Sequence, residues 1–228
     1  MKKTKKIILS VLAAVLAIAL GIGLFFAAPM LAMKPAKTGL VLESYYLPIS
    51  TLRSGRGNLY LIDTGDGYLM IDAGASIASV ESGLAELSID PAQVKWILLT
   101  HSHGDHVAAL PLFPDAEVYI GEGESLPAAP QDIQFLSSGE VLLFGNIEVE
   151  CIAAPGHTPG SMLYRVNKAY LFTGDALRWS GAGTNMGISV HPFTMDEAQA
   201  RETIAALPDA WIVLTSHYGW YGPPISGS

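Results

Sequence analysis

The stretch that most constrains this 228-residue chain is His101-Ser102-His103-Gly104-Asp105-His106, which places three imidazoles and one carboxylate within six residues. Half of the six histidines lie in this window. Imidazole nitrogens and carboxylate oxygens bind divalent cations, and alternate positions of an extended segment put His101 and His103 side by side. Asp105 and His106 then point elsewhere, toward where a second ion would lie. The pattern predicts a metal site rather than a solvated polar turn.

Three later residues of ligand type repeat one feature of this stretch, because each comes just after an apolar run that predicts a strand. The first run, residues 96–100, precedes the histidine-rich stretch; the others are residues 147–153, 169–173 and 210–215, followed by His157, Asp175 and His217. Position after a strand is a weak signal for any one residue. Four occurrences with ligand chemistry each time predict a shared site.

Other segments indicate further short strands. Residues 41–49, 58–63 and 68–72 are rich in β-branched and aromatic residues, and each is expected to form one strand. The turn Gly65-Asp66-Gly67 between the last two indicates a hairpin. The single Cys151 lies in an apolar strand pattern, which favours a buried small hydrophobe over a reactive thiol.

Helices are expected in three places. Apolar residues spaced for one helix face predict a helix over residues 76–87, and a short helix is expected over 106–112. Thr194 and Glu197 have the spacing of a capping box, which predicts that a helix over 195–207 begins there.

The N-terminal region predicts a membrane segment. Four lysines within the first six residues precede an uncharged run of 27 residues, positions 7–33, which is long enough to cross a hydrocarbon layer of about 30 Å as a helix. A cleaved signal peptide is the alternative, but Ala27-Ala28-Pro29 is a poor cleavage site. Because lysines hold their flank in the cytoplasm, the rest of the chain is expected outside, membrane-anchored or, after cleavage, secreted.

The expected organisation is therefore a basic flank and anchor over residues 1–34, a linker over 35–40 and a catalytic domain over 41–228. Six of the 13 basic residues precede position 38, where there is no acidic residue. The remainder has seven basic against 21 acidic residues, a formal charge of −14. Such a surface repels a polyanion, which argues against nucleic acid and for a small-molecule substrate.

The motif His-x-His-x-Asp-His with the later His, Asp and His resembles that of the metallo-β-lactamase-fold hydrolases, over roughly residues 41–221. The resemblance implies an α/β fold, an αβ/βα sandwich with two sheets between outer helices and metals at one edge. It implies one metal held by His101, His103 and His157, and a second held by Asp105, His106 and His217. Asp175 would bridge them. Asp72, in Ile71-Asp72-Ala73-Gly74, would support the site from behind.

Two such cations would lower the pKa of a water molecule and polarise the oxygen of the bond to be cleaved. Asp105 is the expected catalytic carboxylate, which orients the attacking hydroxide. A nitrogen-rich ligand set favours zinc, so the expected cofactors are two divalent ions, with iron or manganese as alternatives.

The carboxylate at position 175 differs from the cysteine of many zinc β-lactamases and resembles the glyoxalase II, lactonase and phosphodiesterase branches. Only 11 residues follow His217, so the helical glutathione-binding region of glyoxalase II is not expected. The prediction is an extracytoplasmic di-metal hydrolase of a small ester, lactone, thioester or phosphodiester. Two alternatives remain, a membrane-tethered metal-binding sensory module without turnover and a β-lactam hydrolase.

The substrate-binding wall is expected after Asp175 and in the tail, where aromatic and amide side chains lie close to ligands in the sequence. The candidates are Trp179, Asn185, Tyr218, Trp220 and Tyr221, although packing explains them equally well. His191 stands outside the ligand pattern and is not expected in the site.

Overall fold

The computed structural model describes residues 15–18, 33, 39–42, 47–126, 132–180, 187–210 and 212–222. The chain divides into two units, Met1–Met33 and Lys34–Ser228, and every element described below belongs to the second. Most of the predicted anchor lies outside the described residues. Within the described ranges, no helix combines the length and the apolar character needed to cross a membrane.

The first sheet contains seven strands that pair in the order of the chain. The early pairs, up to β3 with β4, are antiparallel, whereas β4, β5, β6 and β7 run parallel. The strands are β1 Gly39–Leu42, β2 Ile49–Ser54, β3 Gly57–Asp63, β4 Tyr68–Ile71, β5 Val94–Leu99, β6 Glu117–Gly121 and β7 Ile133–Leu136. The hairpin predicted at Gly65-Asp66-Gly67 is confirmed, since β3 and β4 pair across it.

The second sheet contains six strands in the order β15-β14-β11-β10-β9-β8. All its pairs are antiparallel except β11 with β14, so these two strands end at the same edge. The strands are β8 Val141–Phe144, β9 Ile147–Ala153, β10 Met162–Val166, β11 Tyr170–Phe172, β14 Ile212–Leu214 and β15 Trp220–Tyr221. A separate ribbon pairs β12 Arg178–Ser180 with β13 Gly187–Ser189.

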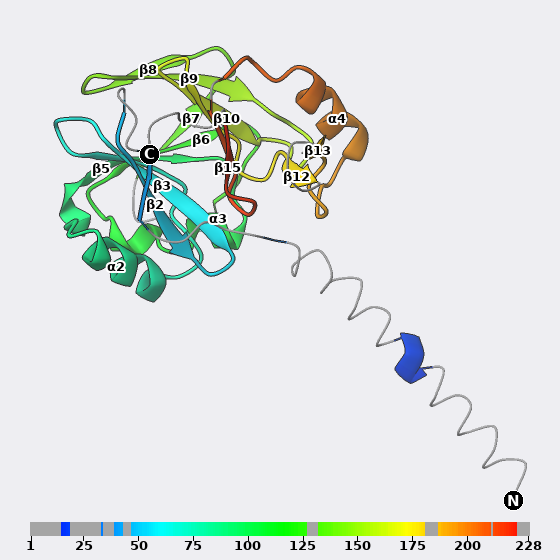
Figure 1. Ribbon diagram of the computed structural model, residues 1–228, viewed down its shortest axis with the longest axis horizontal. Coiled ribbons are helices and arrows are strands. Elements are labelled where there is room, and N and C mark those ends of the chain that lie inside the picture. The colour runs from blue at the N-terminus through cyan, green and yellow to red at the C-terminus, as the bar shows by residue number, and fades with distance from the viewer. Residues whose placement is uncertain are drawn as a thin grey trace, which may run out of the picture. The chain divides into compact units, whose positions relative to one another are not determined.

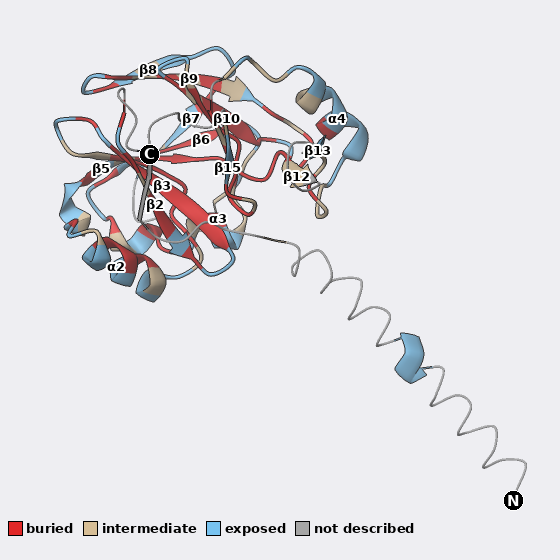
Figure 2. Cartoon of the chain, viewed as in Figure 1, coloured by how far each residue is buried: buried red, intermediate tan, exposed pale blue. Residues whose placement is uncertain are grey.

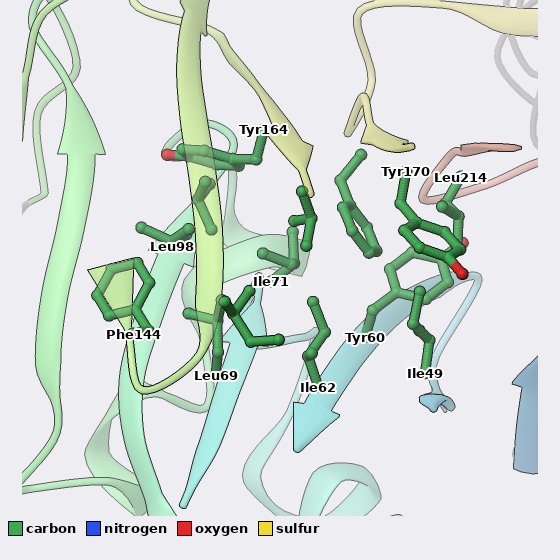
Figure 3. Packing of buried hydrophobic residues seen from close by; sticks show 14 of the residues in the cluster. Ile49, Tyr60, Ile62, Leu69, Ile71, Leu98, Phe144, Tyr164, Tyr170 and Leu214 are labelled. Carbon is green, nitrogen blue, oxygen red and sulfur yellow. The ribbon is translucent and has the colours of Figure 1, made fainter. Parts of the chain in front are cut away.

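The two sheets pack face to face over a buried apolar layer (Figure 3). Alternation along β3 shows how both faces of the first sheet are covered: Tyr60 and Ile62 point into this layer, whereas Leu59 and Leu61 belong to the core on the opposite face. Cys151 is fully buried in the layer between the sheets, as predicted, and burial raises the pKa of its thiol to about 12.

Helices cover the outer faces, and the predicted αβ/βα sandwich is confirmed (Figures 1 and 2). Helix α2, Ile77–Glu86, buries Val80 and Leu84 against the first sheet, and its N-cap Ser76 accepts a hydrogen bond from Ser79 N. Helix α4, Glu197–Ala205, lies on the side of the second sheet and buries Ala200. The short elements are α3 Gly104–Val107 and the 3-10 turns η1 Pro91–Gln93 and η2 Leu110–Leu112.

Three local predictions are wrong. The single strand expected over residues 41–49 is instead the end of β1 and the start of β2, which pair antiparallel, because an apolar pattern does not show where an extended chain reverses. The helix expected over 106–112 begins at Gly104 and is interrupted before η2, where Pro111 occupies the first turn. Asp196 caps α4 in place of Thr194, whose hydroxyl donates to the carbonyl of His191.

Candidate metal centre

All seven predicted ligands follow strand ends, after β5, β9, β11 and β14. The two sheets are joined at these ends, because Met162 N donates to the Thr100 carbonyl at 2.8 Å and the Tyr164 hydroxyl to the Leu99 carbonyl at 2.6 Å. The Tyr60 hydroxyl donates in the same way to the Thr215 carbonyl at 2.6 Å. Ligand-bearing loops from both sheets are therefore held at a set separation.

The first cluster contains His101, His103 and His157, whose ligand atoms all lie within 4.8 Å of one another. Their ring centroids are 4.6 to 4.8 Å apart, and their planes are nearly perpendicular, at 78° to 88°. His101 and His157 are buried and His103 is half-buried. Three imidazoles that converge in this way form a nitrogen donor set for one ion.

The second cluster contains Asp105, His106 and His217. His217 Nε2 lies 3.3 Å from Asp105 Oδ2, and His106 Nε2 lies 3.9 Å from Asp105 Oδ1. Both histidines are buried, whereas 45% of the Asp105 side chain is exposed. This carboxylate therefore faces both the cluster and solvent.

Asp175 lies between the two clusters. Its Oδ1 is 3.6 Å from His106 Nε2, and its Oδ2 is 3.6 Å from His157 Nε2 and 3.2 Å from His217 Nε2. The preceding Gly174 has a φ of +52°, and a Cβ there would lie 2.4 Å from the Thr100 hydroxyl oxygen. Only glycine lets the chain pass so close to β5 and place Asp175 between the two clusters.

Asp72 lies behind the second cluster. Its Oδ2 accepts a hydrogen bond from His106 Nδ1 at 2.9 Å, and its Oδ1 accepts from Thr100 N at 2.8 Å. The residue has a φ of +61°, a left-handed conformation that is strained for a side chain with a Cβ. Because Nδ1 of His106 donates to Asp72, Nε2 is the nitrogen that would bind a cation.

His217 is oriented in the same way by a different partner. Its Nδ1 lies 2.9 Å from the Arg56 carbonyl, which can only accept a hydrogen bond, so Nδ1 carries the proton. Nε2 then faces Asp105 and Asp175 and is the nitrogen that would bind a cation.

Glu124, which was not predicted, links the two loops of the first cluster. Its carboxylate accepts hydrogen bonds from Ser102 N at 2.9 Å, beside His101 and His103, and from Gly160 N at 3.1 Å. The hydroxyls of Ser102 and Thr158 also donate to it. No local motif marks a glutamate that closes such a bridge, because its partners lie 22 to 36 residues away.

His191 was expected to lie outside the site, and this prediction is wrong. Its imidazole is 3% exposed, with Nε2 3.8 Å from Asp175 Oδ2 and its ring centroid 5.0 Å from that of His157. The segment after β13 folds back toward His157, since Met195 N and Asp196 N donate to the Gly156 carbonyl. Its place just after a strand was the one signal that could have identified it.

The two clusters differ in their protonation. Burial lowers the pKa of His101 well below its usual range and that of His157 to about 3, against the opposing effect of Asp175. Burial also acts on His106, but Asp72 and Asp175 outweigh it and raise the pKa well above the ordinary value. For His217, Asp175 and Asp105 likewise overcome burial and raise the pKa to about 10.

The carboxylates show the reverse effect. Burial opposes ionisation of Asp175, but His217 and His106 hold its pKa well below the usual range. Burial acts similarly on Asp105, and its hydrogen bond with His217 lowers its pKa to about 2. Burial lowers the pKa of His191 to about 4.

The expected substrate wall is only partly described. The Tyr218 ring lies 6.0 Å from that of His191, and the Trp179 ring lies 5.0 Å from that of Tyr221. Trp220 is 39% exposed on β15. Asn185 lies outside the described residues.

The donor atoms fit a divalent metal. Among the described residues, the buried side-chain atoms without a hydrogen-bond partner include His101 Nε2, His106 Nε2 and Asp175 Oδ1, all of which face the clusters. Native interiors rarely leave such atoms unpaired, and a cation would satisfy all three. The residues therefore form a site for a divalent metal.

Comparison with known proteins connects this site to a family. The family model described as the metallo-beta-lactamase superfamily matches residues 52–217. A hydroxyacylglutathione hydrolase of Aeromonas hydrophila is 32% identical over 175 residues, which cover 75% of this chain and 65% of that protein. The probable polyketide biosynthesis zinc-dependent hydrolase PksB of Bacillus subtilis is 31% identical over 144 residues, 60% of this chain and 62% of PksB. The chain thus spans just under two thirds of either relative.

Solved structures show the same fold. A B3 metallo-beta-lactamase with an active-site glutamic acid superposes with a TM-score of 0.62 at 21% identity, covering 84% of this chain and 85% of the other. At this identity the likeness shows the fold alone.

Proposed function

We infer, because this chain belongs to the metallo-β-lactamase superfamily of hydrolases, that it hydrolyses a small thioester or ester with two zinc ions. The observation that carries the proposal is the position of Asp175, whose two oxygens lie 3.2 to 3.6 Å from imidazoles of both clusters. A buried carboxylate with a donor set on each side suits a pair of cations.

Bound zinc would polarise the substrate carbonyl and lower the pKa of water. The chain contributes the remaining parts of the reaction. Asp105 presents an ionised, half-exposed carboxylate that accepts a hydrogen bond from the attacking water and orients it. The water oxygen forms a bond to the acyl carbon and the carbon–sulfur or carbon–oxygen bond breaks. The products are a carboxylic acid and a thiol or alcohol, which takes up the proton.

The substrate class is supported by the relatives and by charge. The Aeromonas hydrophila relative is named for hydrolysis of hydroxyacylglutathione, an acyl thioester, and PksB is named zinc-dependent. The formal charge of −14 from position 38 onward opposes binding of a polyanion, so the thioester or ester is expected to be small. An acyl carbon is favoured over a phosphodiester for these reasons.

A substrate panel tests the proposal. Zinc- and manganese-loaded protein would be assayed with an acylglutathione, an aryl acetate, a lactone, bis(p-nitrophenyl) phosphate and a chromogenic β-lactam. We expect the highest kcat/KM for the thioester, with His103→Ala as the metal-deficient control. Preference for the phosphodiester or the β-lactam would overturn the substrate class, and inactivity on every compound would favour a metal-binding module without turnover.

We also propose that the catalytic domain lies outside the cytoplasm, held by the N-terminal segment or released from it. The support comes from the sequence alone, from the lysine flank and the 27-residue uncharged run. Protease added to intact cells should degrade the domain if it is anchored. If the segment is cleaved, the domain should be found in the medium. A domain protected until the cells are lysed would contradict this location.

A further inference from the structure

His191 is a buried imidazole that the seven-ligand set does not use. It is 3% exposed, and its Nε2 has no hydrogen-bond partner among the residues that the structure describes. Its ring lies close to rings from both clusters, at centroid distances of 5.0 Å from His157 and 5.7 Å from His217. Because buried polar atoms are nearly always paired, this imidazole nitrogen is available to a partner such as a bound substrate.

The turn that carries His191 is held firmly. The carbonyl of His191 accepts hydrogen bonds from the Thr194 hydroxyl at 2.8 Å and from Thr194 N at 3.3 Å. Further along the same turn, Met195 N donates to the His157 carbonyl at 3.2 Å. The imidazole is therefore fixed relative to a ligand of the first cluster, as a group acting on a substrate must be.

The tautomer of His191 differs from that of the predicted ligands. Its Nδ1 lies 3.4 Å from Phe193 N, a backbone donor, so Nδ1 accepts and Nε2 carries the proton. In His106 and His217 the reverse holds, since Nδ1 donates to Asp72 or to the Arg56 carbonyl and Nε2 is free to bind a cation. Neutral His191 thus presents an N–H to the centre, whereas His106 and His217 would present Nε2 lone pairs once a cation displaces the proton there.

Two other roles fit this geometry less well. A metal ligand would need an unprotonated Nε2, and moving the proton to Nδ1 would set it against the N–H of Phe193. A hydrogen bond to Asp175 is also not made, because 3.8 Å from Nε2 to Oδ2 is too long.

We propose that His191 is a catalytic residue that donates a hydrogen bond from Nε2 to the substrate oxygen on which negative charge develops. This rests on the proposed function, since that oxygen belongs to the acyl group at the metal centre. A donor held in place before the reaction stabilises this charge without reorganisation, and the loss of one such donor typically lowers kcat by about 100-fold or more.

Two variants test the role in the zinc-loaded enzyme. His191→Phe fills the ring's space without a donor, and His191→Gln restores an N–H at a similar reach. We expect the Phe variant to lose about 100-fold in kcat with little change in KM, zinc content or thermal stability. The Gln variant should recover a substantial part of kcat. Met195→Ala, on the same turn but with an exposed side chain, is the matched control and should match the wild type.

Several results would overturn the proposal. Loss of zinc in the Phe variant would make His191 a metal ligand. Equal loss of kcat in the Phe and Gln variants, with zinc retained, would mean that His191 contributes only packing. An unchanged kcat in the Phe variant would remove it from the reaction.

A binding measurement separates this inference from the proposed function. Cobalt-substituted protein would be titrated with inorganic phosphate, which offers oxygens at the same centre, and binding followed in the visible spectrum. We expect the Kd to rise about tenfold in His191→Phe, as for loss of one hydrogen bond to a charged group, and to return toward wild type in His191→Gln, whether or not any thioester is turned over. If the wild type hydrolyses none of the panel but this pattern appears, the substrate class fails and the donor role stands. If the Phe variant binds phosphate as the wild type does, the donor role fails.

Discussion

The two clusters of the metal centre are supported in different ways. His101, His103 and His157 sit on loops joined by Glu124, a half-buried carboxylate. The second cluster, Asp105, His106 and His217, is supported by Asp72. This residue directly follows β4, is 2% exposed and accepts a hydrogen bond from His106. One cluster is held between loops and the other from within the core.

The two clusters also differ in the protonation of their histidines. In the metal-free protein the imidazoles of His101 and His157 are neutral at pH 7, because burial lowers their pKa. Those of His106 and His217 are protonated, because carboxylates raise the pKa of both, that of His217 to about 10. His101 and His157 can therefore bind a cation without releasing a proton, whereas His106 and His217 must each release one.

The largest expected effect comes from removing a ligand of the first cluster. His103→Ala should abolish metal binding there and turnover with it, because two imidazoles do not replace a three-nitrogen set. Zinc content by mass spectrometry and thioester hydrolysis would be measured, with Lys168→Ala, whose side chain is 74% exposed, as the control. Full activity in His103→Ala would refute the first cluster as a metal site.

The protonation contrast predicts different pH dependences for the two metals. The affinity of the first cluster should depend less on pH than that of the second, since burial lowers the pKa of His101 and lowers that of His157 to about 3. The affinity of the second should rise by up to about tenfold per pH unit for each proton displaced, until the pH approaches the pKa of His217, about 10. Zinc titrations at pH 6, 7 and 8 against a chromophoric chelator would measure both. Two parallel profiles would contradict the contrast.

The hydrogen bond from His106 to the buried Asp72 predicts that loss of this carboxylate weakens metal binding at the second cluster alone. Asp72→Asn keeps the shape but removes the charge that holds His106, and the affinity for one of the two ions should fall about 10- to 100-fold. Metal stoichiometry during dialysis against a weak chelator would show which ion is lost. Equal weakening of both would argue against separate supports.

The hydrogen bonds that Glu124 accepts from the two loops of the first cluster predict the smallest loss of activity. Glu124→Gln keeps one acceptor oxygen, and the side chain is only half-buried, so activity should fall by about tenfold, the lower end for groups that orient ligands. Glu122→Gln is the matched control, because its carboxylate accepts a hydrogen bond from Ser137 and, within the described ranges, from no ligand loop. The idea fails if the two variants behave alike.

Much of the fold and the ligand set could be predicted from the sequence because the signals are local. Apolar runs predicted the strands that precede His101, His157, Asp175 and His217, and the family resemblance predicted the sandwich. Local patterns failed where the chain turns: they did not show the reversal between β1 and β2, nor that Thr194 bonds the carbonyl of His191 in place of capping α4.

The sequence by itself determined which side chains have the chemistry to bind metal and which strands they follow, because residue type and periodicity are properties of neighbours along the chain. Only the tertiary structure decided that His191 joins them, that Glu124 bridges their loops, and which nitrogen of each imidazole faces the centre. These features depend on partners up to 161 residues away, as for His217 and the Arg56 carbonyl. Packing of the two sheets brings such groups within hydrogen-bond distance, and no local pattern encodes it.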